Sequence, residues 1–72
     1  MAQLTHSEYD VLERAIIDGR RMVIYRRGTE YVVIPQALRV RDGREVIEAT
    51  HPTTGDTITF DLADVDSLHV IK

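Results

Sequence analysis

Arginines are the residues of this sequence that are best suited to chemistry, and they occur in small groups. Residues 20–28 read RRMVIYRRG, so that two arginines stand on each side of a short apolar run. Three more arginines surround an Asp-Gly pair, at positions 39, 41 and 44. Guanidinium groups bind phosphate and carboxylate oxygens through paired hydrogen bonds. The pattern therefore predicts either an anion site or a set of surface ion pairs.

The remaining polar residues do not have the spacing of a catalytic or metal site. His6, His51 and His69 lack the four-residue helical spacing and the Cys or Glu companions of a metal site. The aspartates between residues 61 and 66 would need burial to act as an acid and base pair, and we expect them in a solvated turn instead. The four glycines each accompany a turn rather than a phosphate-binding loop. We therefore expect no enzyme activity, no metal and no cofactor.

Length and charge limit the class of protein. The 72 residues predict a single domain over 1–72, because so short a chain buries only about 60% of its unfolded surface. A hydrophobic fraction of 43% with 29% charged residues is that of a globular protein, and there is no cysteine to add disulfides. The net charge of -3 argues against a surface built entirely for nucleic acid, although eight of the nine basic residues precede residue 45. With no apolar run long enough for a membrane span, we expect a cytoplasmic location.

A helix is predicted over about residues 5–18. Thr5 and Glu8 form the sequence pattern of a capping box, and Gly19 is suited to end the helix. Arg20 and Arg21 then stand where positive charge meets the negative end of the helix dipole. The apolar residues fall on one helical face, namely Tyr9, Val11, Leu12, Ala15 and Ile16.

After Gly19 the pattern changes to short strands separated by turns. We expect strands near 21–26, 30–34, 36–41, 44–50, 56–61 and 67–71. Pro35 predicts a bend or bulge in the long second segment, and Asp42-Gly43 predicts a tight hairpin turn. Leu62 and Val65 fit a single helical turn before the last strand. The predicted fold is mainly β (α+β): an N-terminal helix followed, over about 21–71, by a small five-stranded antiparallel barrel of the Sm-like or Src-homology-3-like kind.

The hairpin predicts a local cluster of positive charge. A two-residue turn at 42–43 places Arg41 opposite Arg44, with Arg39 on the same face. Like charges directly opposite each other repel, so an anion lies between them or the turn is wider. Alternatively Glu45 and Glu48 neutralise the arginines within the chain.

A second group of candidates surrounds the first turn. If Arg26 points outward with the hairpin arginines, the basic patch extends into a stripe that follows a nucleic-acid backbone, and Arg27 stands beside it. Tyr25 and Tyr31 are the aromatic residues placed to stack on a base, and the alternative is that both pack at the rim of the barrel.

The succession LERAI, MVIYRRG, IPQAL, DGREVIEA and TFDLADVDSLHV, over residues 12–71, resembles the WYL domain of bacterial transcriptional and defence-system regulators. The resemblance implies a Sm-like barrel that acts as an accessory or regulatory module and contacts nucleic acid or a nucleotide-like anion. The Trp-Tyr-Leu triad of the family falls in REVIEA, where this chain has Val46 and Ile47. The positions of the family's ligand arginines align with Ile58 and Asp64, so this chain has neither arginine.

Two functions remain open from the sequence. The first is a non-enzymatic module that contacts an anion or nucleic acid through Arg26, Arg39, Arg41 and Arg44. The alternative is a protein-interaction or homodimerisation module that uses an exposed strand edge or the face of the helix.

Overall fold

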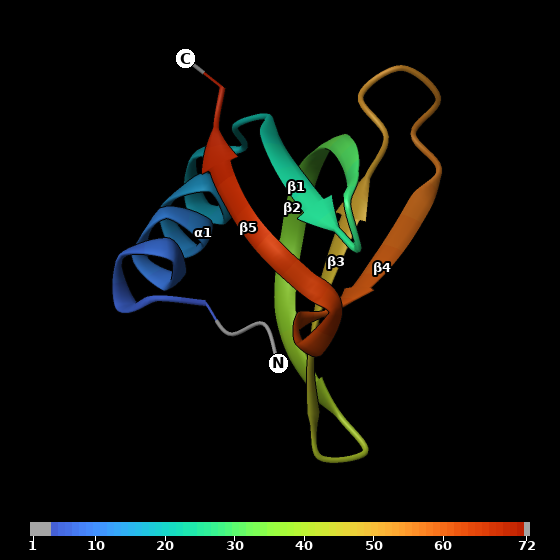
Figure 1. The fold of residues 1–72 in the computed structure, drawn as a ribbon. Coiled ribbons are helices and arrows are strands. Elements are labelled where there is room, and N and C mark those ends of the chain that lie inside the picture. Colours follow the sequence, from blue (N-terminus) through green and yellow to red (C-terminus); the bar gives the residue numbers. More distant parts are fainter. Residues whose placement is uncertain (1–3, 72) are drawn as a thin grey trace.

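The structure is a computed structural model that describes residues 4–71, and it begins with helix α1 (His6–Asp18) (Figure 1). The Glu8 amide donates to the Thr5 hydroxyl over 3.1 Å, and the Glu8 carboxylate accepts from the Thr5 amide over 2.9 Å. Gly19 ends the helix with a φ of 67°, in the left-handed region that glycine adopts without strain. Both predicted ends of the helix are confirmed.

Five antiparallel strands follow the helix (Figure 1). They are β1 (Met22–Arg26), β2 (Thr29–Arg41), β3 (Arg44–Thr50), β4 (Thr57–Asp61) and β5 (Val65–Val70). They form one sheet in the order β4-β3-β2-β1-β5. The predicted class of an N-terminal helix with a small five-stranded antiparallel barrel-like sheet is confirmed. The sheet is not closed, because β4 and β5 do not pair with each other and remain its two edges.

Three predicted strand segments differ from the structure in how they are divided or where they begin. The predicted segments 30–34 and 36–41 form one continuous strand, β2, with a shift of register between Pro35 and Ala37. Proline has no amide hydrogen for the ladder, and the bulge accommodates it without ending the strand. The last strand begins at Val65 rather than Ser67, because Val65 pairs with Arg26 of β1 across a shift of register at Asp66. The exposed Asp66 carboxylate accepts from the Gly28 amide over 3.1 Å.

The turn between β2 and β3 has the predicted two-residue form. Asp42 and Gly43 have φ values of 52° and 76°, and Arg41 pairs directly with Arg44. Positive φ at both turn residues is typical of the type I′ turn, whose twist matches that of the strands. The hairpin tip extends beyond the body of the molecule at the bottom of Figure 1.

The core lies inside the curl of the sheet, and α1 packs against β5 and β2 along one side of it. The largest fully buried side chains are Phe60, Leu12, Met22, Ile24, Ile47, Val33, Val65 and Pro35. A 3-10 helix, η1 (Leu62–Asp64), connects β4 to β5, and it buries Leu62 just before Val65. The predicted helical turn is therefore confirmed. None of the helices among the described residues is long and apolar enough to cross a membrane.

Candidate anion-binding cleft and hairpin arginines

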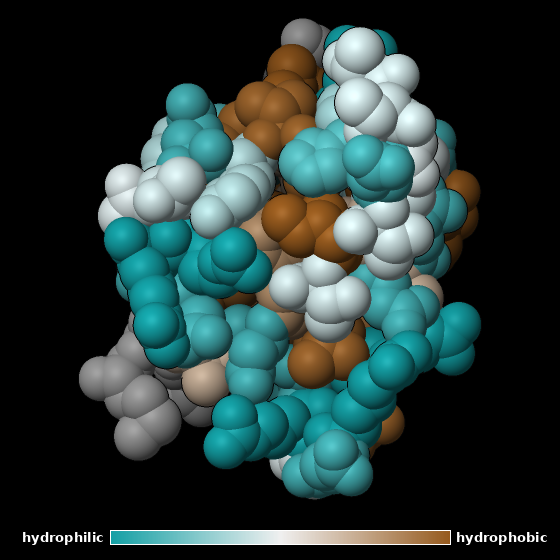
Figure 2. Space-filling model, turned by 90° about the vertical axis from the view of Figure 1, so that its right-hand side faces the viewer, coloured by the Kyte–Doolittle hydropathy of each residue, from teal (hydrophilic) through white to brown (hydrophobic). Residues whose placement is uncertain are grey.

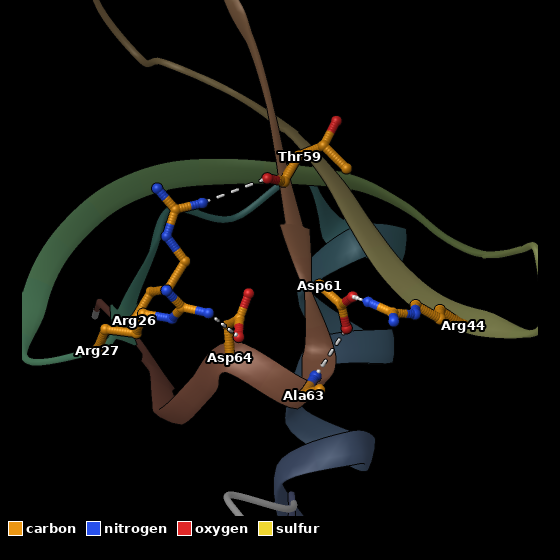
Figure 3. Close-up of polar contacts among 7 residues, drawn as sticks. All are labelled: Arg26, Arg27, Arg44, Thr59, Asp61, Ala63 and Asp64. Carbon is orange, nitrogen blue, oxygen red and sulfur yellow. Dashed lines mark hydrogen bonds and ion pairs between the residues drawn. The ribbon is translucent and has the colours of Figure 1, made fainter.

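Arg26 is held at the end of β1 by two aromatic rings and two neutral oxygens, of which Figure 3 shows the carbonyl oxygen of Thr59. Its guanidinium carbon lies 4.7 Å from the centre of the Tyr31 ring and 5.0 Å from that of Phe60. Nη2 donates to the Tyr31 hydroxyl over 3.0 Å, and Nη1 donates to the Thr59 carbonyl of β4 over 3.4 Å. Stacking on aromatic faces and hydrogen bonding together fix the plane of this guanidinium.

Arg26 does not point in the direction that the predicted arginine stripe requires. Side chains alternate along a strand, so Arg26 lies on the same side of β1 as the buried residues Met22 and Ile24. The Arg26 side chain therefore points toward the mouth of the curled sheet and not outward. There its guanidinium lies over the rings of Tyr31 and Phe60. The outward stripe from Arg26 to the hairpin is not formed, because the aromatic surface lies on the inner side.

Arg27 and its neighbours complete a polar cleft beside Arg26. Arg27 lies in the turn between β1 and β2 with a φ of 50°, and its Nη2 lies 2.9 Å from Oδ1 of Asp64 (Figure 3). A cleft of about 370 Å³ opens here, lined by Arg26, Arg27, Thr29, Tyr31 and Asp64. We call this site the Arg26–Arg27 cleft. It brings three of the seven predicted site residues together.

The other three arginines lie on the hairpin and form ion pairs within the chain. Arg39 Nε lies 2.7 Å from Glu48, and Arg41 binds the second oxygen of the same carboxylate. Arg44 Nη1 lies 3.2 Å from Asp61 (Figure 3). Arg41 and Arg44 do face each other, but they form ion pairs with different carboxylates. The structure thus has the internal pairing that the sequence left open, with Glu48 as the shared acceptor.

Glu45, the other carboxylate considered from the sequence, has a different partner. Its Oε1 accepts from the Tyr9 hydroxyl of α1 over 3.0 Å. Burial and this bond raise the pKa of Tyr9. Glu45 therefore connects the hairpin to the helix and does not neutralise an arginine.

The paired carboxylates are held in the ionised form. The hydrogen bond from Arg39 lowers the pKa of Glu48, and the nearby charges of Arg39 and Arg41 add to this effect against some desolvation. The amide of Ala63 is the main cause of the lowered pKa of Asp61, with Arg44 contributing further. Because Glu48 serves two arginines, the group of Arg39, Arg41 and Glu48 keeps one positive charge.

The two candidate tyrosines contact their neighbours in the fold. The Tyr25 hydroxyl donates to Glu30 over 3.2 Å, which raises the pKa of Tyr25, and its ring lies 5.9 Å from that of His69. The Tyr31 ring meets Phe60 edge to face at 5.3 Å. These contacts are those of rim residues, and base stacking by either ring stays a prediction.

Sequence reasoning missed Asp64 and Thr29 as lining residues of the cleft. Arg27 and Asp64 are 37 residues apart, and they meet only because η1 is folded back beside the turn between β1 and β2. No local spacing signals such a contact. Within residues 4–71, no group of three His, Asp or Glu side chains is arranged to hold a metal ion.

Comparisons with models of known protein families and with curated proteins give no match for this chain.

Proposed function

We propose that this chain is a non-enzymatic binding module that holds an anionic group, such as a phosphate of nucleic acid or of a nucleotide-like ligand, in the Arg26–Arg27 cleft. The observation that carries the proposal is the setting of Arg26. Among residues 4–71, Arg26 forms no ion pair with a carboxylate, and its hydrogen bonds go to the neutral oxygens of Tyr31 and Thr59. Its guanidinium is fixed in place without a carboxylate in ion-pair contact.

Arg27 is the second ligand in this proposal. Its side chain is 77% exposed and rests on Asp64, so an incoming phosphate competes with one solvated carboxylate. Exposed ion pairs contribute only about 0–1 kcal/mol, so a phosphate can replace Asp64 as the partner of Arg27 at little cost in free energy. Two guanidinium groups and the hydroxyl of Thr29 then surround the anion.

The hairpin offers a second contact for a longer polyanion. The group of Arg39, Arg41 and Glu48 keeps one positive charge on an exposed strand pair. The resemblance to WYL domains implies anionic ligands and a regulatory or accessory role, although Ile58 and Asp64 stand at the positions of the family's ligand arginines. We therefore propose, as part of the same hypothesis, that this chain is related to the WYL domains.

Fluorescence anisotropy with a labelled single-stranded oligonucleotide at low salt tests the proposal. We expect binding that weakens as salt rises, because each phosphate contact releases counterions. Arg27→Gln removes one contact and is expected to weaken binding by about fivefold. Asp64→Asn removes the competing carboxylate and is expected to tighten it by about threefold. Arg21→Gln, an exposed arginine outside the cleft, is the charge-matched control.

A comparison of two ligands distinguishes binding in the cleft from binding on the hairpin. Pyrophosphate occupies the cleft alone, so Arg41→Glu is expected to weaken binding of the oligonucleotide and not of pyrophosphate. The absence of binding at low salt overturns the proposal, as does equal affinity of Arg27→Gln and the unchanged chain.

A further inference from the structure

A groove of about 820 Å³ lies between α1 and β5, away from the residues of the Arg26–Arg27 cleft. Its floor is apolar and contains Val11 and Ala15 of α1 together with Leu68 and Val70 of β5. Figure 1 shows α1 and β5 side by side along this part of the molecule. Apolar grooves of this kind mark sites of contact with other molecules.

One wall of the groove is a free strand edge. The Ile71 amide donates to the Arg21 carbonyl on the β1 side, over 3.0 Å, whereas the Leu68 amide donates away from β1 to Glu8, over 3.3 Å. Hydrogen-bonding directions alternate along a strand, so the N–H and C=O of Val70 also face away from β1. Glu8 covers the edge at Leu68, and within residues 4–71 no other strand pairs with the edge at Val70.

Two exposed apolar residues lie in, or directly after, the same two elements as the groove. Within residues 4–71 the large hydrophobic side chains that remain exposed are Ile17, Val32, Val40 and Ile71. Ile17, which is 80% exposed, belongs to the last turn of α1, and Ile71 follows directly on β5.

Charges on the helical rim favour a second copy of this chain as that molecule. Asp10, Arg14 and Asp18 line the groove at four-residue spacing, so they form one row along α1. In an antiparallel approach centred near residue 16, each Arg14 meets Asp18 of the partner subunit. The row is thus complementary to itself, as a two-fold symmetric interface requires.

We propose that the groove is a homodimer interface, formed by antiparallel pairing of β5 with the same strand of a second copy around a two-fold axis at Val70. Each Val70 amide then donates to the Val70 carbonyl of the partner subunit. The sheet continues across the axis, and the two helices meet at their Arg14 and Asp18 rows. A standard interface buries about 800 Å² of each partner, or about a sixth of the 4793 Å² surface of this chain.

Sedimentation equilibrium of the full chain with charge-reversal variants tests the proposal. Arg14→Asp alone and Asp18→Arg alone each place like charges across the axis, and each is expected to weaken the dimer by about tenfold. The double variant restores opposite charges and is expected to recover the original dissociation constant to within about threefold. Glu13→Arg, on an exposed part of α1 that does not line the groove, is the matched control.

Hydrogen exchange provides a second measurement on the unchanged chain. Protection of the Val70 amide is expected to rise with protein concentration, while that of Ile71 stays constant because it already binds Arg21. Arg27→Gln is expected to leave the dimer intact, which separates this interface from the anion site. A chain that stays monomeric at all concentrations overturns the proposal. A dimer that the single reversals do not weaken, or the double variant does not restore, overturns it as well.

Discussion

Arg26 in β1 donates a hydrogen bond to the Thr59 carbonyl in β4, across a distance of 3.4 Å, although these two strands do not pair with each other. The strands β4 and β5 do not pair with each other, and the Arg26 side chain joins β1 to β4 where no backbone ladder does. The same guanidinium covers the rings of Tyr31 and Phe60 at the mouth of the core. Arg26 therefore has a structural role alongside its proposed role as an anion ligand.

The structural role of Arg26 predicts a difference between the two neighbouring arginines. Arg26→Ala is expected to lower the free energy of unfolding by about 1–2 kcal/mol, because it removes the stacking on both rings and the bond to Thr59. Arg27→Ala breaks only an exposed ion pair and is expected to cost less than about 0.5 kcal/mol. Urea denaturation of both variants measures the difference. Equal losses would contradict the structural role of Arg26.

A substitution in the turn between β2 and β3 is predicted to lower stability through backbone conformation alone. Gly43 has a φ of 76°, and an added Cβ would meet no atom within 4 Å. Gly43→Ala is therefore expected to cost about 1 kcal/mol of stability from the strained backbone alone. The neighbouring Asp42, also at positive φ, serves as control, since Asp42→Asn places another residue that tolerates this region. Thermal melting of both variants tests this, and an unchanged melting temperature for Gly43→Ala would contradict it.

Glu8 is predicted to matter more for stability than the residue that caps the helix. Thr5→Ala removes one capping bond and is expected to cost about 1 kcal/mol. Glu8→Ala removes two acceptors, one for the Thr5 amide and one for the Leu68 amide of β5, and we expect a loss of about 2 kcal/mol. Chemical denaturation compares the two, with Glu13→Ala as the exposed helical control. A smaller loss for Glu8→Ala than for Thr5→Ala would show that the bond to Leu68 contributes nothing.

The elements of the fold that depend on neighbouring residues could be predicted from the sequence. The capping box at Thr5 and the turn at Asp42-Gly43 each need only a few adjacent positions to form. The bulge at Pro35 follows from its missing amide hydrogen. Local chemistry was sufficient for these features.

The arrangement of the arginines could not be predicted in the same way. Whether Arg26 points inward or outward depends on where Phe60 comes to lie, 34 positions later in the chain. The choice of acceptor for Arg39 also depends on the exact strand register, which puts Glu48 diagonally across from it. These contacts join residues far apart in the sequence, and only the curl of the sheet decides them.

The shared carboxylate of Glu48 predicts a pH dependence of stability. The hydrogen bond from Arg39 lowers the pKa of Glu48 below its ordinary value of 4.5 in the folded chain. The unfolded chain therefore binds more protons than the folded chain in this range. The stabilisation from Glu48 is present above pH 4.5 and is lost as the pH falls through the lower folded pKa. Thermal melts in acid are expected to show this loss, and Glu48→Gln is expected to reduce it.

The two arginines are predicted to contribute unequally to this pKa. The bond from Arg39 is the largest cause of the shift, so Arg39→Gln is expected to raise the pKa of Glu48 further toward 4.5 than Arg41→Gln does. Titration of the Glu48 side-chain carboxyl carbon by NMR measures both shifts directly, and Arg21→Gln provides the control for net charge. A midpoint for Glu48 at or above 4.5 in the unchanged chain would show that the ion pairs with Arg39 and Arg41 do not persist in solution. Arg39 and Arg41 would then be free to contact a polyanion without first giving up a carboxylate partner.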